Sequence, residues 1–433
     1  MSIVIPEYRV STDRLRVGVF IRLEGLRWHE HPFLFKNFKI SSVSQIQTLK
    51  AMGIKEVICV PGKSSAQPLG EGEEAAAAPP EEAPVDKSSV DELWRIKQER
   101  GEQLKKHQEM IAQCEKSYAA SQERVGRIMT GVAAADPASV EDAAEFAEGF
   151  SKSFLEDTSS TLHLMRFAGQ EETIYYHSMN VAVLAMMLGR EVGIQPEEMK
   201  ILCQGALFHD IGKSRIDRKI LLKDRPLTRV ETESLQQHPK HGVDILAYSE
   251  TFPKLALIII YQHHECADGS GYPKGVMGLQ FHRLSRIVSI ANVYDNHCNK
   301  RDPADSLTPS EALSFMYARQ KAALGEQLLT SFIRCLSVYP PGTVVQLNNG
   351  AIGMVIAVKP GDQLHPSVIL YDPEIPPKDA LVIDLEDDPE LQITQTIRPA
   401  ALPKEIFDYL SPRTRITYYV DPAEHAQGEP PAP

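Results

Sequence analysis

The sequence predicts a mainly α-helical protein with a small α/β module in front of the helical region and a small β-rich extension behind it. Helical periodicity of apolar residues dominates from residue 140 to residue 336, and few segments there alternate with period two. The first 62 residues contain short strand-like runs. Further strand-like segments, separated by Asn-Asn-Gly and Pro-Gly turn signals, follow Pro340. A chain of 433 residues is also too long for one ordinary domain, so two or three are expected.

Residues 1–62 are predicted to form a regulatory α/β module. Arg16–Leu23 alternates, with Val17 and every second residue after it on one side, which is typical of a half-buried strand. Ser42–Met52 carries its apolar residues on one helical face, and Val57–Val60 is a short apolar strand. The module contains no candidate catalytic residue.

Residues 63–89 are rich in Ala, Pro, Glu and Ser and are predicted to be a disordered linker, because they bury too little apolar surface to offset their chain entropy. Residues 90–139 are predicted to form a long connecting helix. Gly101 and the weak heptads favour a helix that packs on its own domain, and a coiled-coil homodimer is the alternative. The helical domain is placed at 140–336, the β-rich extension at 337–420 and a disordered tail at 421–433.

The composition excludes several classes of protein. Apolar residues make up 42% of the chain, as in soluble globular proteins, and the formal net charge is −12, which argues against a DNA-binding protein. The six cysteines form no CxxC pair, so neither a disulfide framework nor a zinc ribbon is expected. The N-terminus has no apolar signal core, and the most apolar run, Leu255–Tyr261, is too short to span a bilayer. We therefore expect a soluble, cytoplasmic protein without membrane insertion.

Four helical segments in the central region deliver histidine or aspartate. An Asp next to a His at the end of an apolar helix, as in Asp210 after His209, is costly to bury unless something binds it, and a divalent metal is the simplest compensation. Lys213 follows one turn later and can point a cation at the same place. The alternative is a set of core histidines satisfied by hydrogen bonds, which the whole series makes less plausible. The series is His177, His209-Asp210, His238 and His263-His264.

The segment after His264 reads ECADGSGYPKGV, whose Gly, Asp and Pro residues predict an irregular loop. Beside a metal site such a loop becomes a candidate substrate-facing element. Tyr272 could stack on a base, and backbone N–H groups could face a phosphate.

Together these motifs resemble the HD-GYP family. The matching segments are HDIGK at 209–213, HPKHG at 238–242, HHECADGSGYPKG at 263–275 and RIVSIANVYDNHCNKRDP at 286–303. The resemblance covers roughly residues 165 to 305 and implies an HD-type helical bundle. The N-terminal stretch also resembles an uncharacterised module found before HD-GYP domains in Gram-negative bacteria.

The resemblance implies a metal-dependent phosphodiesterase that hydrolyses cyclic di-GMP to pGpG, and often onward to GMP. It implies two divalent ions, with Fe or Mn expected and Ni, Zn or Mg as alternatives, and a diguanylate cyclase (GGDEF) protein as a partner. Asp210 would bridge the two ions. The implied ligands are His177, His209 and Asp210 for the first ion, and Asp210, His238, His263 and His264 for the second.

The same resemblance assigns the residues that meet the substrate. Lys213 would contact the scissile phosphate and act with Asp210 in catalysis, and Gly271, Tyr272 and Pro273 would form the substrate-facing loop. Asp295 and Arg301 match positions that help to hold the nucleotide.

The chain departs from the family pattern at three positions. Thr173 stands where members with a third metal carry a Glu, Asn292 stands where a metal-ligating Asp is usual, and Ala304 replaces a Lys. Either Asn292 or Asp295 could complete the first metal site. Two other functions therefore stay open: a hydrolase that prefers pGpG, and a receptor that binds the nucleotide or a partner protein without catalysis.

Overall fold

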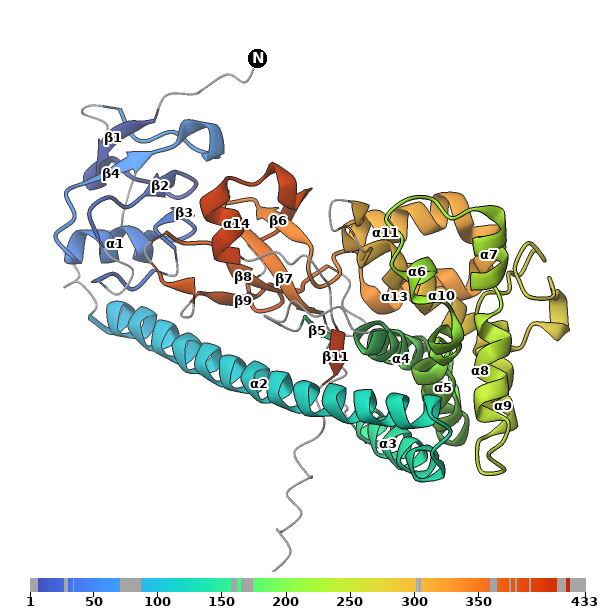
Figure 1. Cartoon of the computed structure of the whole chain (residues 1–433). Coiled ribbons are helices and arrows are strands. Elements are labelled where there is room, and N and C mark those ends of the chain that lie inside the picture. The colour runs from blue at the N-terminus through green and yellow to red at the C-terminus, as the bar shows by residue number, and fades with distance from the viewer. Residues whose placement is uncertain are drawn as a thin grey trace, which may run out of the picture.

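The computed structural model describes residues 7–26, 30–33, 35–70, 87–156, 162–164, 174–300, 302, 305–358, 364–373, 375–377, 380–388, 391–410 and 418–420. The mainly α-helical fold class that the sequence predicts is confirmed. Figure 1 shows the C-terminal β-region between the N-terminal module and the helical domain, with one long helix running along all three.

The N-terminal module is a four-stranded antiparallel sheet in the order β1-β4-β2-β3, covered by one helix. Val19 and Ile21 are fully buried, as the alternation predicts, but Val17 is 44% exposed. The predicted strand starts too early because Gly18 adopts a positive φ of 97°, and pairing begins only at Phe20. The elements are β1 (Tyr8–Ser11), β2 (Phe20–Arg22), β3 (Asn37–Lys39), α1 (Val43–Ala51) and β4 (Glu56–Cys59).

The predicted linker is wrong at both ends. The N–H of Ser65 donates to the carbonyl of Gly18 at 2.8 Å and that of Leu69 to Arg14 at 2.9 Å, so this segment packs on the N-terminal module. Helix α2 already begins at Lys87 (Lys87–Ala133), and residues 71–86 lie outside the described residues.

The predicted connecting helix 90–139 is two helices. Ala135, with φ of 60°, leaves the helical conformation, and α3 (Pro137–Glu156) starts with a proline, whose missing N–H costs nothing in a first turn. The side chain of Arg124 on α2 forms an ion pair with Asp142 on α3 at 2.5 Å, so the second helix folds back along the first.

The helical domain is built around α4, whose residues from Val181 to Leu188 are all at most 5% exposed. This helix packs against α5 and α10, and α5 packs against α9. The elements are α4 (Ile174–Glu191), α5 (Pro196–Phe208), η4 (Ile211–Arg215), α6 (Arg218–Leu221), α7 (Arg229–Leu235), α8 (His238–Leu246), α9 (Lys254–Gln262), η5 (Gly278–Gln280), α10 (Arg283–Cys298), α11 (Pro309–Phe315), η7 (Met316–Gln320), α12 (Lys321–Leu324) and α13 (Glu326–Leu336).

The C-terminal β-region is a seven-stranded antiparallel sheet that includes one strand from before α4. Its path is β10-β6-β7-β5-β11, with β8 paired to β7 and β9 to β8. Nζ of Lys63 in the N-terminal module donates to the carbonyl of Asn349 at 3.1 Å, in the turn between β6 and β7. The elements are β5 (Leu162–Leu164), β6 (Val344–Leu347), β7 (Ile352–Val358), β8 (Ser367–Leu370), β9 (Val382–Asp384), β10 (Ile393–Ile397), α14 (Lys404–Leu410) and β11 (Tyr418–Val420). The predicted tail, 421–433, lies outside the described residues.

Within the described part of the chain, no helix combines the length and the apolar character needed to cross a membrane.

Candidate metal centre

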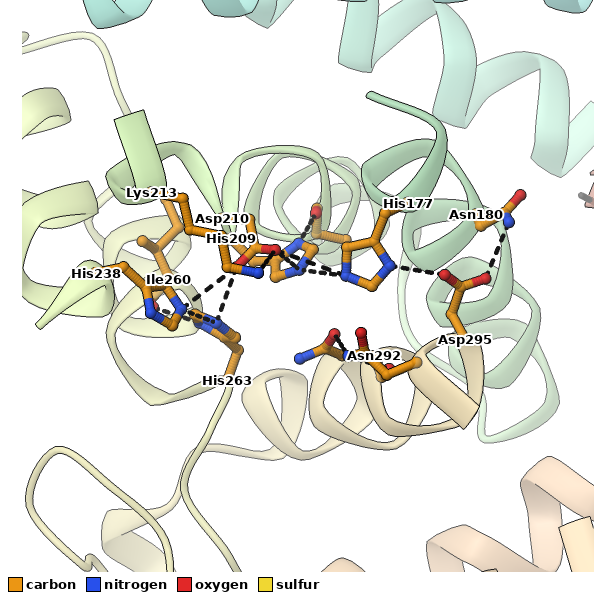
Figure 2. A network of polar contacts seen from close by, with 12 residues as sticks. His177, Asn180, His209, Asp210, Lys213, His238, Ile260, His263, Asn292 and Asp295 are labelled. Atoms are coloured by element: carbon orange, nitrogen blue, oxygen red, sulfur yellow. Dashed lines mark hydrogen bonds and ion pairs between the residues drawn. The ribbon is translucent and has the colours of Figure 1, made fainter. Parts of the chain in front are cut away.

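Histidines from four helical segments meet around Asp210, at the centre of the helical domain (Figure 2). Three of them are buried (His209, His238 and His263), and His177 and His264 are partly buried. They form two groups that share this aspartate, and within each group one ligand atom per residue lies within 4.8 Å of the others. The first metal group is His177, His209 and Asp210, and the second metal group is Asp210, His238, His263 and His264.

The helix ends themselves fix the orientation of three of these rings. Nδ1 of His209 lies 2.6 Å from the carbonyl of Ala206, and Nδ1 of His263 lies 2.7 Å from that of Ile260, each at the end of its own helix. Nδ1 of His238 makes the same contact with a carbonyl at 2.7 Å. A carbonyl can only accept, so Nδ1 carries the proton and Nε2 offers a lone pair, as in metal-binding histidines.

The Nε2 lone pairs converge in two pairs. Nε2 of His177 lies 3.2 Å from Nε2 of His209, and Nε2 of His238 lies 3.1 Å from Nε2 of His263. Lone pairs that face each other in a buried site repel unless a cation lies between them. Two ligands at roughly 2.1 Å from one ion and near a right angle would be about 3 Å apart, which fits both pairs.

Asp210 presents one carboxylate oxygen to each group. Oδ2 lies 3.4 Å from Nε2 of His209 and 3.7 Å from that of His177, whereas Oδ1 lies 3.3 Å from Nε2 of His238 and 3.7 Å from that of His263. No hydrogen bond reaches Oδ1 among the described residues, although the side chain is buried. His238 cannot supply one from Nε2 because its proton lies on Nδ1. An orphaned, buried oxygen facing neutral imidazoles fits a divalent cation.

The electrostatics keep Asp210 ionised. Burial alone would raise its pKa, but the ammonium of Lys213 and the ring of His209 lower it, and the net pKa lies well below the ordinary value. Nζ of Lys213 lies 2.5 Å from Oδ2. The Lys213 side chain is 27% exposed, so its charge stands between the buried carboxylate and the solvent.

Burial keeps three of these histidines neutral. It lowers the pKa of His209 and, together with the neighbouring rings of His209 and His238, lowers that of His263 to about 3. Burial and the ring of His263 also hold the pKa of His264 well below its usual range. Neutral imidazole is the form that binds a metal, so near pH 7 the site needs no proton release from these rings.

Family models match three consecutive parts of the chain. A domain of unknown function, DUF3391, matches residues 7–143, an HD domain matches 160–328, and a KOW domain associated with HD domain matches 344–405. The chain is 27% identical over 364 residues to a cyclic di-GMP phosphodiesterase of Pseudomonas aeruginosa, and the match covers 84% of each protein. The HD-domain match and this relative support the resemblance to the HD-GYP family.

Two other relatives match shorter parts of the chain. A cyclic di-GMP phosphodiesterase response regulator of Xanthomonas campestris pv. campestris is 32% identical over 152 residues, which is 35% of this chain and 40% of that relative. A 3'3'-cGAMP-specific phosphodiesterase of Vibrio cholerae is 30% identical over 164 residues, which is 38% of this chain and 35% of that relative. HD-domain phosphodiesterases depend on metal ions, and this HD-GYP chain has buried groups that could hold them.

Asp295 has a different place from the one that the family pattern implied. It is buried, and its Oδ2 accepts a hydrogen bond from Nδ1 of His177 at 2.7 Å. Its Oδ1 accepts from Nδ2 of Asn180 at 2.9 Å and of Asn299 at 2.8 Å. Both oxygens are thus used inside the protein, so Asp295 orients a metal-group histidine where a nucleotide contact was expected. Asn180, which the sequence reasoning missed, lies one turn after His177 on the same helix face, and that spacing is a signal that could have found it.

Asn292 lies beside the two groups on α10 and is buried (Figure 2). Its Oδ1 accepts a hydrogen bond from Nδ2 of Asn296 at 2.7 Å, one turn further along the helix. Three positions named from the family pattern lie outside the described residues: Thr173, Arg301 and Ala304.

The GYP loop of this family member (residues 265–276) meets the second metal group through Tyr272. The Tyr272 ring, expected to stack on a base, stacks on His264 with 4.6 Å between ring centroids and an interplanar angle of 18°. Gly271 and Pro273 flank Tyr272 in the sequence. Burial raises the pKa of the Tyr272 hydroxyl, which therefore stays protonated. Sequence reasoning missed Glu265, although an acidic residue directly after two buried histidines is a signal of a structural role.

Proposed function

We propose that this chain is a metal-dependent phosphodiesterase that hydrolyses cyclic di-GMP to pGpG, with GMP as a further product. The observation that carries the proposal is the Asp210 carboxylate, whose two oxygens face two separate histidine groups. The similarity to a cyclic di-GMP phosphodiesterase of Pseudomonas aeruginosa over 84% of both chains supports this substrate.

The first metal group and the second metal group would hold one divalent ion each, with Asp210 between them. Imidazole and carboxylate donors suit Fe or Mn, and Ni, Zn or Mg are alternatives. When bound, such a pair lowers the pKa of water to near neutrality and stabilises negative charge on a phosphate.

The side chains of this chain have separate tasks in that reaction. Asp210 stays ionised, and His209, His263 and His264 stay neutral, because the pKa of each of these groups is lowered; each can therefore offer a lone pair to a cation. The partly exposed ammonium of Lys213 would bind a non-bridging phosphate oxygen and donate a proton to the leaving 3′ oxygen. Gly271, Tyr272 and Pro273 would limit the position of the nucleotide, and Arg301 would contact its phosphates.

A second candidate substrate is 3'3'-cGAMP, since the chain is also 30% identical, over 164 residues, to a cGAMP-specific relative. That match covers 38% of this chain, so cyclic di-GMP stays the first choice.

The test is turnover by the purified full chain, loaded anaerobically with Fe or Mn. Cyclic di-GMP, 3'3'-cGAMP and pGpG are offered separately, and the products are resolved by chromatography. We expect cyclic di-GMP to be converted fastest, with no conversion by Asp210→Ala. Binding without turnover would make the chain a receptor, and faster conversion of pGpG would make it a hydrolase of the linear dinucleotide.

A further inference from the structure

His264 differs from the other histidines of the two metal groups. His177 is held by a carboxylate, and three other rings are each held by a main-chain carbonyl. No such hydrogen bond holds the His264 ring among the residues that the structure describes. Metal-binding histidines are normally oriented through their second nitrogen, so something else must orient this ring.

Stacking on the Tyr272 ring orients the His264 ring where a hydrogen bond orients the other histidines. The two rings stack at 4.6 Å and 18°, and the Tyr272 ring also meets His238 edge-on at 6.4 Å and 77°. The main chain repeats this link, because the N–H of Tyr272 donates to the carbonyl of His264 at 3.1 Å. The orientation of His264 therefore depends on where the GYP loop places Tyr272.

The GYP loop lies directly against the chain that carries His264. A Cβ atom on Gly271 would lie 2.4 Å from the nitrogen of Cys266 and 2.5 Å from the Cα atom of Glu265 and the carbonyl oxygen of His264. These are main-chain atoms that cannot move aside singly. The close packing of Gly271 against the main chain of residues 264–266 therefore fixes where the next residue of the loop, Tyr272, lies.

The buried Glu265 side chain holds the two ends of the GYP loop together by hydrogen bonds. Its side chain is 1% exposed, and its two carboxylate oxygens accept from the N–H groups of Lys274 at 2.8 Å and Val276 at 3.0 Å. These donors stand nine and eleven residues further along the chain. One buried carboxylate therefore ties the far end of the GYP loop to the residue that follows His264.

We infer that Glu265 is a positioning residue: through the GYP loop it presses Tyr272 onto His264 and so sets the orientation of that ligand in the second metal group. The inference rests on the proposed function only in assuming that this group binds a metal. It requires no particular nucleotide.

The experiment uses Co²⁺ as a probe on the metal-free full chain. Glu265→Gln keeps the size of the side chain but puts an N–H₂ group against one of the two N–H donors. We expect its Co²⁺ affinity at the second metal group to fall about 10–100-fold, as for the loss of other groups that orient metal ligands. The visible absorption of the bound Co²⁺ should also change, while the first metal group keeps its affinity.

Asp268→Asn is the matched control. Asp268 is an exposed acid of the same loop, and its carboxylate accepts from the N–H and hydroxyl of Ser270, at 3.0 and 2.6 Å. This variant should bind Co²⁺ with the affinity and spectrum of the unmodified chain.

Tyr272 variants test the route. Tyr272→Phe keeps the stacked ring and should preserve the Co²⁺ spectrum, whereas Tyr272→Ala should reproduce the change seen in Glu265→Gln. The double variant Glu265→Gln/Tyr272→Ala should be no weaker than Tyr272→Ala, because both changes act through one contact.

Unchanged Co²⁺ binding and spectrum in folded Glu265→Gln would overturn the inference. The same result in Tyr272→Ala would overturn it even if Glu265→Gln did not fold. If the variants change Co²⁺ binding as expected but the unmodified chain turns over no dinucleotide, the proposed function fails and this inference stands.

Discussion

Nδ1 of His177 donates a hydrogen bond to Oδ2 of Asp295 across 2.7 Å, although the two residues are 118 positions apart in the sequence. This contact directs Nε2 of His177 towards His209 and Asp210 (Figure 2). Asp295 is itself held by Asn180, so α10 fixes a ligand that α4 carries.

Asp295→Ala should therefore lower metal affinity at the first metal group about 10–100-fold, since the ring of His177 loses its orientation and its proton acceptor. The second metal group should keep its affinity. A competitive metal titration of the purified chain measures both. Asp305→Ala, an exposed acid after the same helix, is the control. Equal loss at both groups would mean that Asp295 supports the fold and not this ligand.

Asp210→Ala should abolish hydrolysis and remove more than one metal equivalent, because one oxygen of Asp210 faces each group. We expect two equivalents in the unmodified chain, since Thr173 brings no carboxylate for a third ion. Elemental analysis of gel-filtered protein gives the stoichiometry, and circular dichroism checks that the variant folds. Loss of a single equivalent would remove Asp210 from the bridging role.

Asn292→Asp should strengthen metal binding at the first metal group by about tenfold or more, because an added negative charge close to a divalent ion lowers its free energy. The hydrogen bond from Asn296 to Oδ1 can persist with a carboxylate. Calorimetric titration with Mn²⁺ is the measurement. Asn296→Asp, an exposed position one turn away, serves as the comparison. An equal gain from both changes would assign the effect to net charge alone.

Gly212→Ala should disturb the second metal group through the backbone. An added Cβ would lie 1.9 Å from the carbonyl oxygen of His238 and 2.5 Å from the nitrogen of Gly242, so η4 must move away from α8. We expect a loss of about 1–3 kcal/mol or more in the free energy of unfolding, together with weaker metal binding. Urea denaturation of the metal-free chain measures the first effect. Gly149→Ala, where a Cβ meets nothing within 4 Å, should be neutral or slightly stabilising.

The start of α7 should loosen at low pH. The ammonium of Lys223 and then the N–H of Thr228 lower the pKa of Glu231 from 4.5 to about 2 in the folded chain. The stability that this carboxylate contributes is fully present above its unfolded pKa and is lost as pH falls through the folded value, that is, between about pH 4.5 and pH 2.

Hydrogen exchange of the amides in residues 228–231, measured at several pH values, tests this expectation. Exchange, corrected for its intrinsic pH dependence, should accelerate across that window in the unmodified chain. Glu231→Gln should exchange faster at pH 7 and should lose the pH dependence. A window unchanged by that substitution would point to another carboxylate.

The sequence by itself determined the helical class of the domain and the residues that we propose to carry its chemistry. Both are local properties: apolar periodicity marks the buried face of each helix, and His209-Asp210 and His263-His264 stand where such faces end. Only the tertiary structure decided how these residues are oriented. The contacts of Asp295 with His177, and of Glu265 with Lys274, join distant or looped segments, and their geometry depends on how closely helices such as α8 and η4 pack. Packing of this kind has no period in the sequence, which is why Asp295 was expected at the nucleotide and Glu265 was missed.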